Sequence, residues 1–376
     1  MGKIKIFYII DRMTSGAGTE NQLTELIAHI DRNRFEPTII TLRQPVKDDN
    51  TQFLRMKCPH IRLHVNRLLS PGGLWGVLKL AALVRRQKVD IVHTFFVDSN
   101  FIGVLGGFLG GCRKIVVSRR DIGFWYTPKL LFSLRQLNRM ADWFLTNCEA
   151  IKRVVIEKEK FCADRVRVIH NGIFNLPDEQ ESKLTKTDIK VPEDALLVGI
   201  VANLREVKRL DYFISLAAQI TRPKTHFVII GTGPLINQLK EQIKRENIED
   251  KIDFTHTSEN IYDYIKLFDV GVLTSESEGL SNALIEYQLC GIPAVAFNTG
   301  GNREIIEHGI TGFLAEMGDL ETMKKIVERL LNDYELRREI GKSAAKKARV
   351  LYSGPRMVKQ TSDFYYEILG IKSDLN

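Results

Sequence analysis

Short apolar segments alternate with amphipathic ones along both halves of this 376-residue sequence. The first apolar segment, Ile4 to Ile10, leads through a glycine-containing turn into a stretch with apolar residues at helical spacing. Six further strands are expected in the first half, at residues 38–42, 61–65, 91–94, 114–118, 143–146 and 166–170. Strands that alternate with helices pack as a parallel, doubly wound sheet, so the expected fold class is α/β.

The alternation stops between residues 175 and 192, where Pro177 and Pro192 flank a charged stretch without apolar periodicity. A second series of strands follows, at residues 196–202, 225–230, 252–255, 270–273 and 294–297. Hydrophobic cores stop growing at about 250 to 300 residues, so two domains are expected. We expect Rossmann-like domains at 1–175 and 193–350, a linker at 176–192, and a C-terminal helix at 351–376 whose amphipathic pattern permits it to return to the first domain.

The net charge of +8 is unevenly distributed. Residues 1–175 carry 28 basic and 15 acidic side chains, whereas the remainder carries 26 and 31. A basic half suggests an anionic partner, which is a membrane surface, a nucleic acid or a phosphorylated acceptor. Aromatic residues among the basic ones are too few for a single-strand groove, so no nucleic acid is expected.

Two segments of the basic half combine aromatic and aliphatic residues with Arg and Lys, at 74–86 and 124–139. This pattern suits helices that lie in a membrane interface, and it suits equally well core-facing helices with solvated charges. The first strand is too short for a signal sequence or a membrane span, so we expect a cytoplasmic protein, peripheral on the inner face of the membrane. Five scattered cysteines show no metal-ligand spacing, and no metal site is expected.

Residues 273–286 contain the strongest candidate for a binding site. An apolar strand ends in a polar loop with Gly279, and a helix is expected to begin near Ser281, where free backbone N–H groups bind anions. Glu278 lies at the entrance of this loop and Glu286 about two turns further along. One carboxylate could bind sugar hydroxyls and the other the ribose of the same nucleotide sugar. The alternative is a capping loop with a solvated glutamate.

This stretch, with residues 287–296 after it, resembles the two-glutamate motif of the family 4 glycosyltransferases. Segments 299–306 and 309–314 resemble the glycine-rich loop and the following turn of that family. The resemblance implies the GT-B fold, with two Rossmann-like domains facing each other across a cleft, and transfer with retained anomeric configuration. It implies that Glu278 contacts the transferred sugar and that Glu286 binds ribose. The diphosphate is then held by the backbone of Gly279, Leu280 and Ser281.

A basic segment follows the first strand of the second domain. Without a metal, positive side chains must neutralise the leaving diphosphate, and this segment supplies Arg205 and Lys208. In the family pattern an arginine stands where this chain has Asn203, and the lysine falls on Lys208. Arg205 is therefore expected to replace the missing arginine beside Asn203 in the donor site. The alternative is a solvated charged loop.

Two glycine-rich loops are further candidates for the donor site. Gly231 and Gly233 follow a buried strand, where α/β sheets bind ligands, although a tight turn explains them equally well. The other loop resembles the N-terminal glycine-rich loop of the family, which reaches the donor phosphate or the acceptor; its residues are Gly16, Gly18 and Thr19. Asn21 occupies the third glycine position of the dinucleotide fingerprint, which disfavours NAD. No cofactor is expected besides the nucleotide-sugar substrate.

Three residues of the first domain complete the expected site. His93 ends a strand where relatives often carry a cleft-facing histidine, although a lone histidine there is as often structural. After the next strand, where many relatives have another histidine, this chain has Arg119 and Arg120, which suit an acceptor phosphate or the donor diphosphate.

The sequence therefore predicts a retaining, metal-independent glycosyltransferase. Its donor is a nucleotide diphosphate sugar, expected to be a UDP-sugar because these are the commonest among relatives. The second domain is expected to bind this donor. The first is expected to bind the acceptor, a cell-surface glycan or a lipid-linked molecule in polysaccharide biosynthesis. The alternatives are a GT-B sugar-nucleotide epimerase and a non-catalytic module that binds polyanions or membranes.

Overall fold

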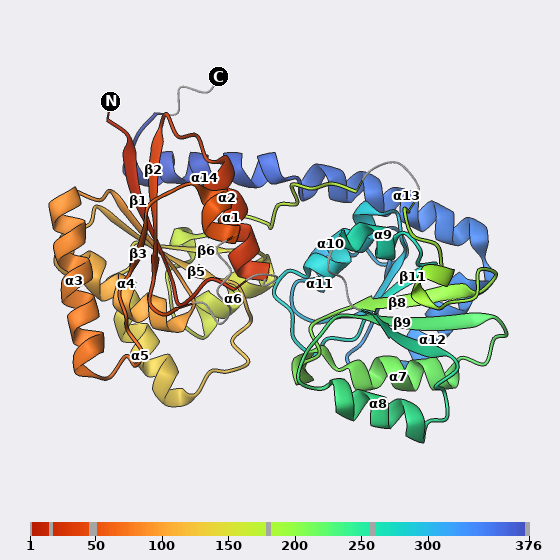
Figure 1. Cartoon of the computed structure of the whole chain (residues 1–376). Coiled ribbons are helices and arrows are strands. Elements are labelled where there is room, and N and C mark those ends of the chain that lie inside the picture. Colours follow the sequence, from red (N-terminus) through yellow and green to blue (C-terminus); the bar gives the residue numbers. More distant parts are fainter. Residues whose placement is uncertain (1, 15–17, 45–50, 178–181, 256–259, 373–376) are drawn as a thin grey trace. The chain divides into compact units, whose positions relative to one another are not determined.

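The computed structural model describes residues 2–14, 18–44, 51–177, 182–255 and 260–372, so Gly16 lies outside the described residues. The chain forms two compact units (Figure 1). Unit 1 consists of residues 1–174 and 353–376, and unit 2 of residues 175–352. No helix within the described ranges is long and apolar enough to cross a membrane.

Unit 1 is built on a parallel sheet with the strand order β3-β2-β1-β4-β5-β6-β7. Its strands are β1 (Ile4–Ile10), β2 (Phe35–Thr41), β3 (His60–Arg62), β4 (Ile91–Phe95), β5 (Lys114–Arg119), β6 (Trp143–Thr146) and β7 (Val166–Val168). The order of the strands reverses between β1 and β4. In doubly wound sheets, ligands bind at the carboxyl ends of the strands beside such a reversal.

Helices cover both faces of this sheet (Figure 1). They are α1 (Gly18–His29), α2 (Thr51–Met56), α3 (Pro71–Gln87), α4 (Val97–Gly110), α5 (Pro128–Asn138), α6 (Glu149–Glu157) and α14 (Gly354–Leu369). Strand β1 alternates between two core layers: Ile4, Ile6, Tyr8 and Ile10 pack with α1, α2 and α14, whereas Phe7 and Ile9 pack with α3 and α4.

Unit 2 has a second parallel sheet, with the order β10-β9-β8-β11-β12-β13. Its strands are β8 (Leu196–Val201), β9 (Thr225–Ile230), β10 (Ile252–Thr255), β11 (Val270–Leu273), β12 (Ala294–Phe297) and β13 (Phe313–Ala315). Its helices are α7 (Leu210–Gln219), α8 (Ile236–Arg245), α9 (Ile261–Ile265), α10 (Asn282–Leu289), α11 (Asn302–Ile305), α12 (Leu320–Asn332) and α13 (Tyr334–Leu351). Here the order reverses between β8 and β11.

The expected strands are all present, with ends that shift by a few residues, and one strand was missed. Strand β13 has three residues and lies at the edge of its sheet, so its sequence is too short for a recognisable pattern. The segment expected as a linker differs as well. Ile189 and Val191 are buried, and Lys186 bonds to the carbonyl of Ala195 within unit 2.

The C-terminal segment forms α14 and belongs to unit 1, although it follows unit 2 in the sequence. Its apolar face contributes Met357, Phe364, Tyr365, Ile368 and Leu369 to the core layer that contains α1. The helix begins after Ser353, and the backbone N–H of Gly354 donates to the carbonyl of Ile173, 2.8 Å away. The last helix therefore completes the core of the first unit.

Candidate active site

The polar loops of unit 2 extend from the carboxyl ends of the strands beside the reversal in strand order. Residues 202–209 follow β8, and residues 274–281 follow β11. The two loops are joined by backbone and side-chain hydrogen bonds. The N–H of Glu276 donates to the carbonyl of Val207 at 3.0 Å, and the Thr274 hydroxyl donates to that of Lys208 at 3.0 Å. The sheet thus brings the two candidate segments together at its ligand-binding edge.

An ion pair between Lys208 and Glu278 connects these loops. Lys208 Nζ lies 2.6 Å from Glu278 Oε1, and the exposed fractions of the two side chains are 24% and 10%. A charge-assisted bond of this length fixes both side chains. Any anion that enters must compete with the carboxylate for the lysine, so Lys208 can exchange Glu278 for a ligand phosphate.

Helix α10 begins beside this ion pair. Its N-cap is Ser281, whose hydroxyl accepts a hydrogen bond from the N–H of Leu284. The first turn contains no acidic residue, so the partial positive charge of the helix start is not neutralised within that turn. Glu286 lies on the same helix, partly buried, and burial raises its pKa to about 7. Holding an ionised carboxylate at this position costs free energy.

Glycines allow neighbouring loops to approach this site closely. A Cβ on Gly231 would lie 2.0 Å from the carbonyl oxygen of Ala202, and one on Gly233 2.5 Å from that of Leu204. Gly300 has a φ of 52°, and a Cβ there would lie 1.8 Å from the carbonyl oxygen of Glu278. A larger residue at these positions would push the loops apart. These glycines therefore shape the backbone around Glu278 and the 202–209 loop.

Asn203 and Arg205 lie on the 202–209 loop, and both are exposed. The structure places them on the same loop as Lys208, so three expected donor-site residues share one segment. Gly279, Leu280 and Ser281 immediately precede α10, as expected from the sequence. Leu280 is buried at 6%, so only its backbone is suited to bind a ligand. Thr19 and Gly18 open α1 in unit 1, where Gly18 is exposed.

The expectation that His93 faces a substrate does not hold. His93 is 1% exposed, and its Nδ1 and Nε2 are hydrogen-bonded to the hydroxyls of Tyr365 and Ser118, at 2.7 and 2.8 Å. Burial, followed by the nearby charge of Arg120, lowers its pKa well below the usual value and keeps the ring neutral. His93 is therefore an interior residue with both ring nitrogens hydrogen-bonded.

The two neighbouring arginines have different surroundings: Arg119 is the last residue of β5, and Arg120 directly follows it. Arg119 is 2% exposed and makes two hydrogen bonds to Glu159, at 2.7 and 2.9 Å. Burial alone would raise the pKa of Glu159, but the guanidinium outweighs it and lowers that pKa. Breaking such a pair costs about 3 to 5 kcal/mol, so Arg119 does not suit the expected role of binding a substrate phosphate. Arg120 keeps one hydrogen bond, from Nη1 to Asn171 Oδ1 at 2.9 Å.

Unit 1 contains a cavity of 260 Å³ at the carboxyl ends of β1, β4 and β5. It is lined by Asp11, Phe96, Val97, Ser118, Arg119, Arg120, Asp121 and Trp125. Sequence analysis identified only the arginines among these residues. Asp11 directly follows β1 and Phe96 directly follows β4, and these two strands are neighbours in the sheet. The sequence does not contain the strand order, so it could not show that these two residues lie close together.

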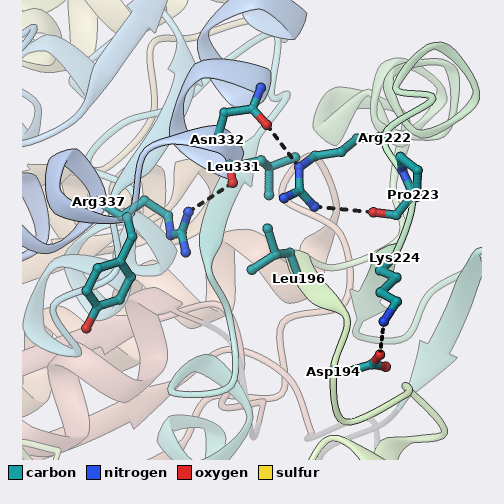
Figure 2. A pocket seen from close by; sticks show the side chains of 9 residues that line it. Asp194, Leu196, Arg222, Pro223, Lys224, Leu331, Asn332 and Arg337 are labelled. Carbon is teal, nitrogen blue, oxygen red and sulfur yellow. Dashed lines mark hydrogen bonds and ion pairs between the residues drawn. The ribbon is translucent and has the colours of Figure 1, made fainter.

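Figure 2 shows a different pocket, at the opposite end of the sheet in unit 2. Its charged side chains are occupied by partners in the chain: Arg222 bonds to Asn332, Lys224 to Asp194, and Arg337 to the carbonyl of Leu331. The pocket lies at the amino ends of β8 and β9, away from the edge where such sheets bind ligands. It is therefore a weak candidate for an active site.

Within the described ranges, no group of three or more His, Cys, Asp and Glu side chains is arranged to hold a metal ion. Lys208 is paired with Glu278, and the next residue, Arg209, has its guanidinium 3.7 Å from Glu276 and 4.2 Å from the ring centre of Tyr212. Sequence analysis did not single out Arg209. Its left-handed backbone, with a φ of 47°, marks the turn that leads from the 202–209 loop into α7.

Two family models match this chain. "Glycosyl transferases group 1" matches residues 182–347 and "Glycosyltransferase Family 4" matches residues 16–174, so together they cover most of both units. Among relatives, the chain is 28% identical to N-acetyl-alpha-D-glucosaminyl L-malate synthase of Bacillus anthracis over 80% of each chain. It is 24% identical to the UDP-Gal:alpha-D-GlcNAc-diphosphoundecaprenol alpha-1,3-galactosyltransferase of Escherichia coli, over 69% of this chain and 70% of the relative.

Solved structures agree on the fold. The crystal structure of Anabaena Alr3699/HepE in complex with UDP-glucose superposes with a TM-score of 0.83 at 21% identity, over 97% of this chain and 100% of that one. Sequence, fold and relatives thus lead to one assignment, and none of them favours an epimerase or a non-catalytic module. The chain belongs to the family 4 glycosyltransferases and is a glycosyltransferase with the GT-B fold.

Proposed function

We propose that this glycosyltransferase transfers a sugar from a UDP-sugar, with retained anomeric configuration, to a lipid-linked or cell-surface glycan acceptor. The observation that carries the proposal is the Lys208–Glu278 ion pair next to the start of α10. These groups combine an exchangeable cation with the positive end of a helix dipole for a diphosphate, and a carboxylate for sugar hydroxyls. The UDP-glucose bound by the HepE neighbour supports the choice of donor.

In the proposed reaction, the bond between the anomeric carbon and the β-phosphate oxygen breaks, and a bond to the acceptor oxygen forms on the same face of the sugar. The proton of the acceptor hydroxyl passes to the departing phosphate, so UDP and the glycosylated acceptor are the products. Lys208, Arg205 and the N–H groups at the start of α10 stabilise the charge that develops on the diphosphate. Glu278 orients the sugar and stabilises its positive charge, and Glu286 holds the ribose.

The remaining donor contacts are assigned to the loops that surround this ion pair. Asn203, Gly231 and Gly233 border the nucleotide, because their loops approach each other closely. The N-terminal loop, with Gly16, Gly18 and Thr19, binds the donor phosphate or the acceptor, with Gly16 outside the described residues. Unit 1 binds the acceptor. The alpha-D-GlcNAc-diphosphoundecaprenol in the name of the Escherichia coli relative supports a lipid-linked one.

A panel of UDP- and GDP-sugars tests the donor. We expect nucleoside diphosphate to be released from a UDP-sugar in the presence of a lipid-linked glycan acceptor, and NMR of the product to show the anomeric configuration of the donor. Turnover of GDP-sugars alone would contradict the choice of base, and an inverted product would contradict the mechanism. Rearrangement of the donor sugar without an acceptor would indicate an epimerase.

Sugar transfer is expected to be unaffected by EDTA, because Lys208, Arg205 and the start of α10 take the place of a metal at the diphosphate. The rate of UDP release, measured before and after dialysis against EDTA, is expected to change less than twofold. A loss of activity that Mg²⁺ or Mn²⁺ restores would show that a metal neutralises the diphosphate, and it would overturn the role given to these side chains.

We also propose that unit 1 binds an anionic membrane surface. On α3, Leu74, Trp75 and Leu78 are 63, 66 and 48% exposed, and on α5 Phe132 is 64% exposed. Both helices contact α4, whose last turn exposes Phe108 at 57%. The excess of basic residues in this half provides attraction to anionic lipid, and the exposed aromatic side chains provide interfacial burial.

Vesicle sedimentation tests this membrane surface. The wild-type protein is expected to sediment with vesicles that contain phosphatidylglycerol at low salt, and Trp75→Ser with Phe132→Ser is expected to weaken binding about 10-fold or more. Ile310→Ser, which replaces a 51% exposed residue of unit 2, is the matched control and is expected to bind normally. Equal binding by both variants, or no binding by the wild type, would exclude this surface.

A further inference from the structure

The cavity of unit 1 is positioned where doubly wound sheets bind ligands. Asp11, Phe96 and Arg120 each directly follow a strand, namely β1, β4 and β5, which lie side by side in the sheet. The reversal in strand order falls between β1 and β4, so these three residues surround the opening at the edge of the sheet. Its volume of 260 Å³ is below the range of about 300–1,000 Å³ typical of drug-sized ligands, so one small unit fits.

Arg120 supplies the cavity with a positively charged side chain. Among the described residues it forms no ion pair, and its Nε is buried without a hydrogen-bond partner. The lowered pKa of its guanidinium, about 10, has burial as its main cause. A partly buried arginine in this state gains from an oxyanion, because the guanidinium can form two parallel hydrogen bonds to it. Its neighbour Arg119 is already paired with Glu159 and lacks this capacity.

Two carboxylates in the same cavity provide acceptors for hydroxyl groups. The side-chain hydrogen bonds of Asp11 and Asp121 within the described chain all go to Oδ1: Ser99 bonds to Asp11, and Gly123 and Trp125 bond to Asp121. The second oxygen of each carboxylate therefore remains available to a ligand. Because burial raises the pKa of both groups, they suit neutral hydroxyls better than cations.

Aromatic side chains form the apolar part of the cavity. Trp125 lines it beside Asp121, and Phe96 lines it after β4. The backbone of Phe96 has φ 69° and ψ 170°, a region occupied almost only by glycine, at a cost of about 1 to 3 kcal/mol. Strain of this kind is kept where the position of a residue matters for function. Aromatic rings beside carboxylates are suited to the apolar and hydroxylated faces of a sugar ring.

A buried layer supports this cavity. Ser118 lines it and is 2% exposed, and its hydroxyl is hydrogen-bonded to His93, which is bonded in turn to Tyr365 of α14. His93 is thus a positioning residue behind the cavity, in place of the catalytic role expected from the sequence.

We infer that this cavity binds the terminal unit of the acceptor, and that this unit is a sugar ring with an oxyanion, either a phosphate or a carboxylate. Arg120 binds the oxyanion, Asp11 and Asp121 accept hydrogen bonds from the hydroxyls, and Trp125 and Phe96 contact the ring. The inference deepens the proposed function, since it rests on the assignment of the acceptor to unit 1. It names the chemical class of acceptor, which the donor site does not determine.

Tryptophan indole NMR tests this inference without a known acceptor. The chain has 3 tryptophans, so a ¹⁵N-labelled protein gives three indole signals, and Trp125→Phe identifies the one from the cavity. The Trp125 indole donates to Asp121 at 2.9 Å, so a ligand in the cavity must shift its signal. Glucose 6-phosphate and glucuronate, each titrated to millimolar concentrations, are the anionic probes, and glucose is the neutral one.

We expect at least one anionic sugar to shift the Trp125 signal with an affinity about 10-fold or more above that of glucose. Arg120→Gln is expected to remove this preference. Arg113→Gln, which removes a 60% exposed arginine at the other end of β5, is expected to keep it. Equal shifts by glucose would overturn the anionic class, and an unmoved Trp125 signal with all three probes would overturn the cavity as acceptor site.

Binding of UDP, followed by calorimetry on the same samples, separates this inference from the proposed function. We expect UDP to bind the wild type and Arg120→Gln equally, because the proposed contacts of UDP do not include Arg120. If UDP does not bind the wild type, the donor assignment fails, whereas the response of Trp125 still decides the nature of the cavity.

Discussion

Lys208→Ala is expected to slow sugar transfer by about 100- to 1,000-fold, the usual loss when one preorganised positive group is removed from a charge-stabilising site. Lys208 Nζ forms a short salt bridge, 2.6 Å long, with Glu278 Oε1. In the proposed reaction this cation moves from the carboxylate to the departing diphosphate. The measurement is the rate of nucleoside diphosphate release at saturating donor, with UDP affinity determined in parallel.

Two further variants make this test specific: Glu278→Gln, and the double variant that combines Lys208→Ala with Glu278→Gln. If lysine and glutamate act as a unit, the double variant is expected to lose little more than the worse single variant. Lys224→Ala is the matched control, because it removes a lysine from an exposed ion pair of the same unit, with Asp194. Exposed pairs contribute about 0 to 1 kcal/mol, so this control is expected to keep full activity. A wild-type rate in Lys208→Ala, with normal UDP binding, would eliminate the proposed site.

Glu286→Gln is expected to change stability and donor binding in opposite directions. Burial raises the pKa of Glu286 from its ordinary value of 4.5 to about 7. Between these two pH values the carboxyl group keeps its proton in the folded protein and loses it in the unfolded chain. The free energy of unfolding therefore falls as the pH rises from about 4.5 to 7, and the loss is complete above that range. A shift of this size corresponds to about 3 kcal/mol.

The glutamine variant carries no such charge, so it is expected to be more stable at pH 8 by up to about 3 kcal/mol, with the difference shrinking towards pH 5. Its affinity for UDP is expected to fall about 10- to 100-fold, because a charged acceptor of the ribose hydroxyls is lost. Calorimetric unfolding at the two pH values and UDP titration measure both effects. Glu241→Gln, an exposed glutamate on α8, is the control and should alter neither.

Either of two contrary results would revise the role proposed for Glu286. A variant that is less stable at pH 8 would mean that the carboxylate has stabilising partners in the folded protein. Unchanged UDP binding would mean that the buried charge serves something other than ribose. The combination expected here, a gain in stability with a loss in binding, is typical of functional residues that are kept at a cost to the fold.

Much of the fold could be predicted from the sequence, because parallel strands buried on both faces appear as separate apolar runs. Strands such as β6, β9 and β12 begin and end where the sequence predicts. The edge strand β13 was not predicted, since a strand of three residues shows no usable periodicity. The break between α13 and α14 was predicted to within a few residues. The C-terminal helix was expected at 351–376, and in the structure α13 ends at Leu351 and α14 begins at Gly354.

More of the proposed donor site than of the proposed acceptor cavity could be predicted from the sequence. Glu278, Glu286 and Lys208 follow local patterns, a strand end and a helix start, which the sequence contains directly. The surroundings of His93 and Arg119 depend instead on Tyr365 and Glu159, which lie 272 and 40 residues away in the sequence. No local pattern distinguishes a buried arginine with a carboxylate partner from its neighbour without one. Pairings of this kind require the tertiary structure.

The position of α14 limits how this enzyme can be divided or recombined. A fragment that stops at residue 174 would lack Phe364, Tyr365 and Leu369, and would expose the apolar surface that these side chains cover on the first sheet. Such a truncated protein is prone to aggregate. Chimaeras that exchange unit 1 with that of a relative must therefore carry residues 353–376 together with the N-terminal half, although unit 2 separates the two in the sequence.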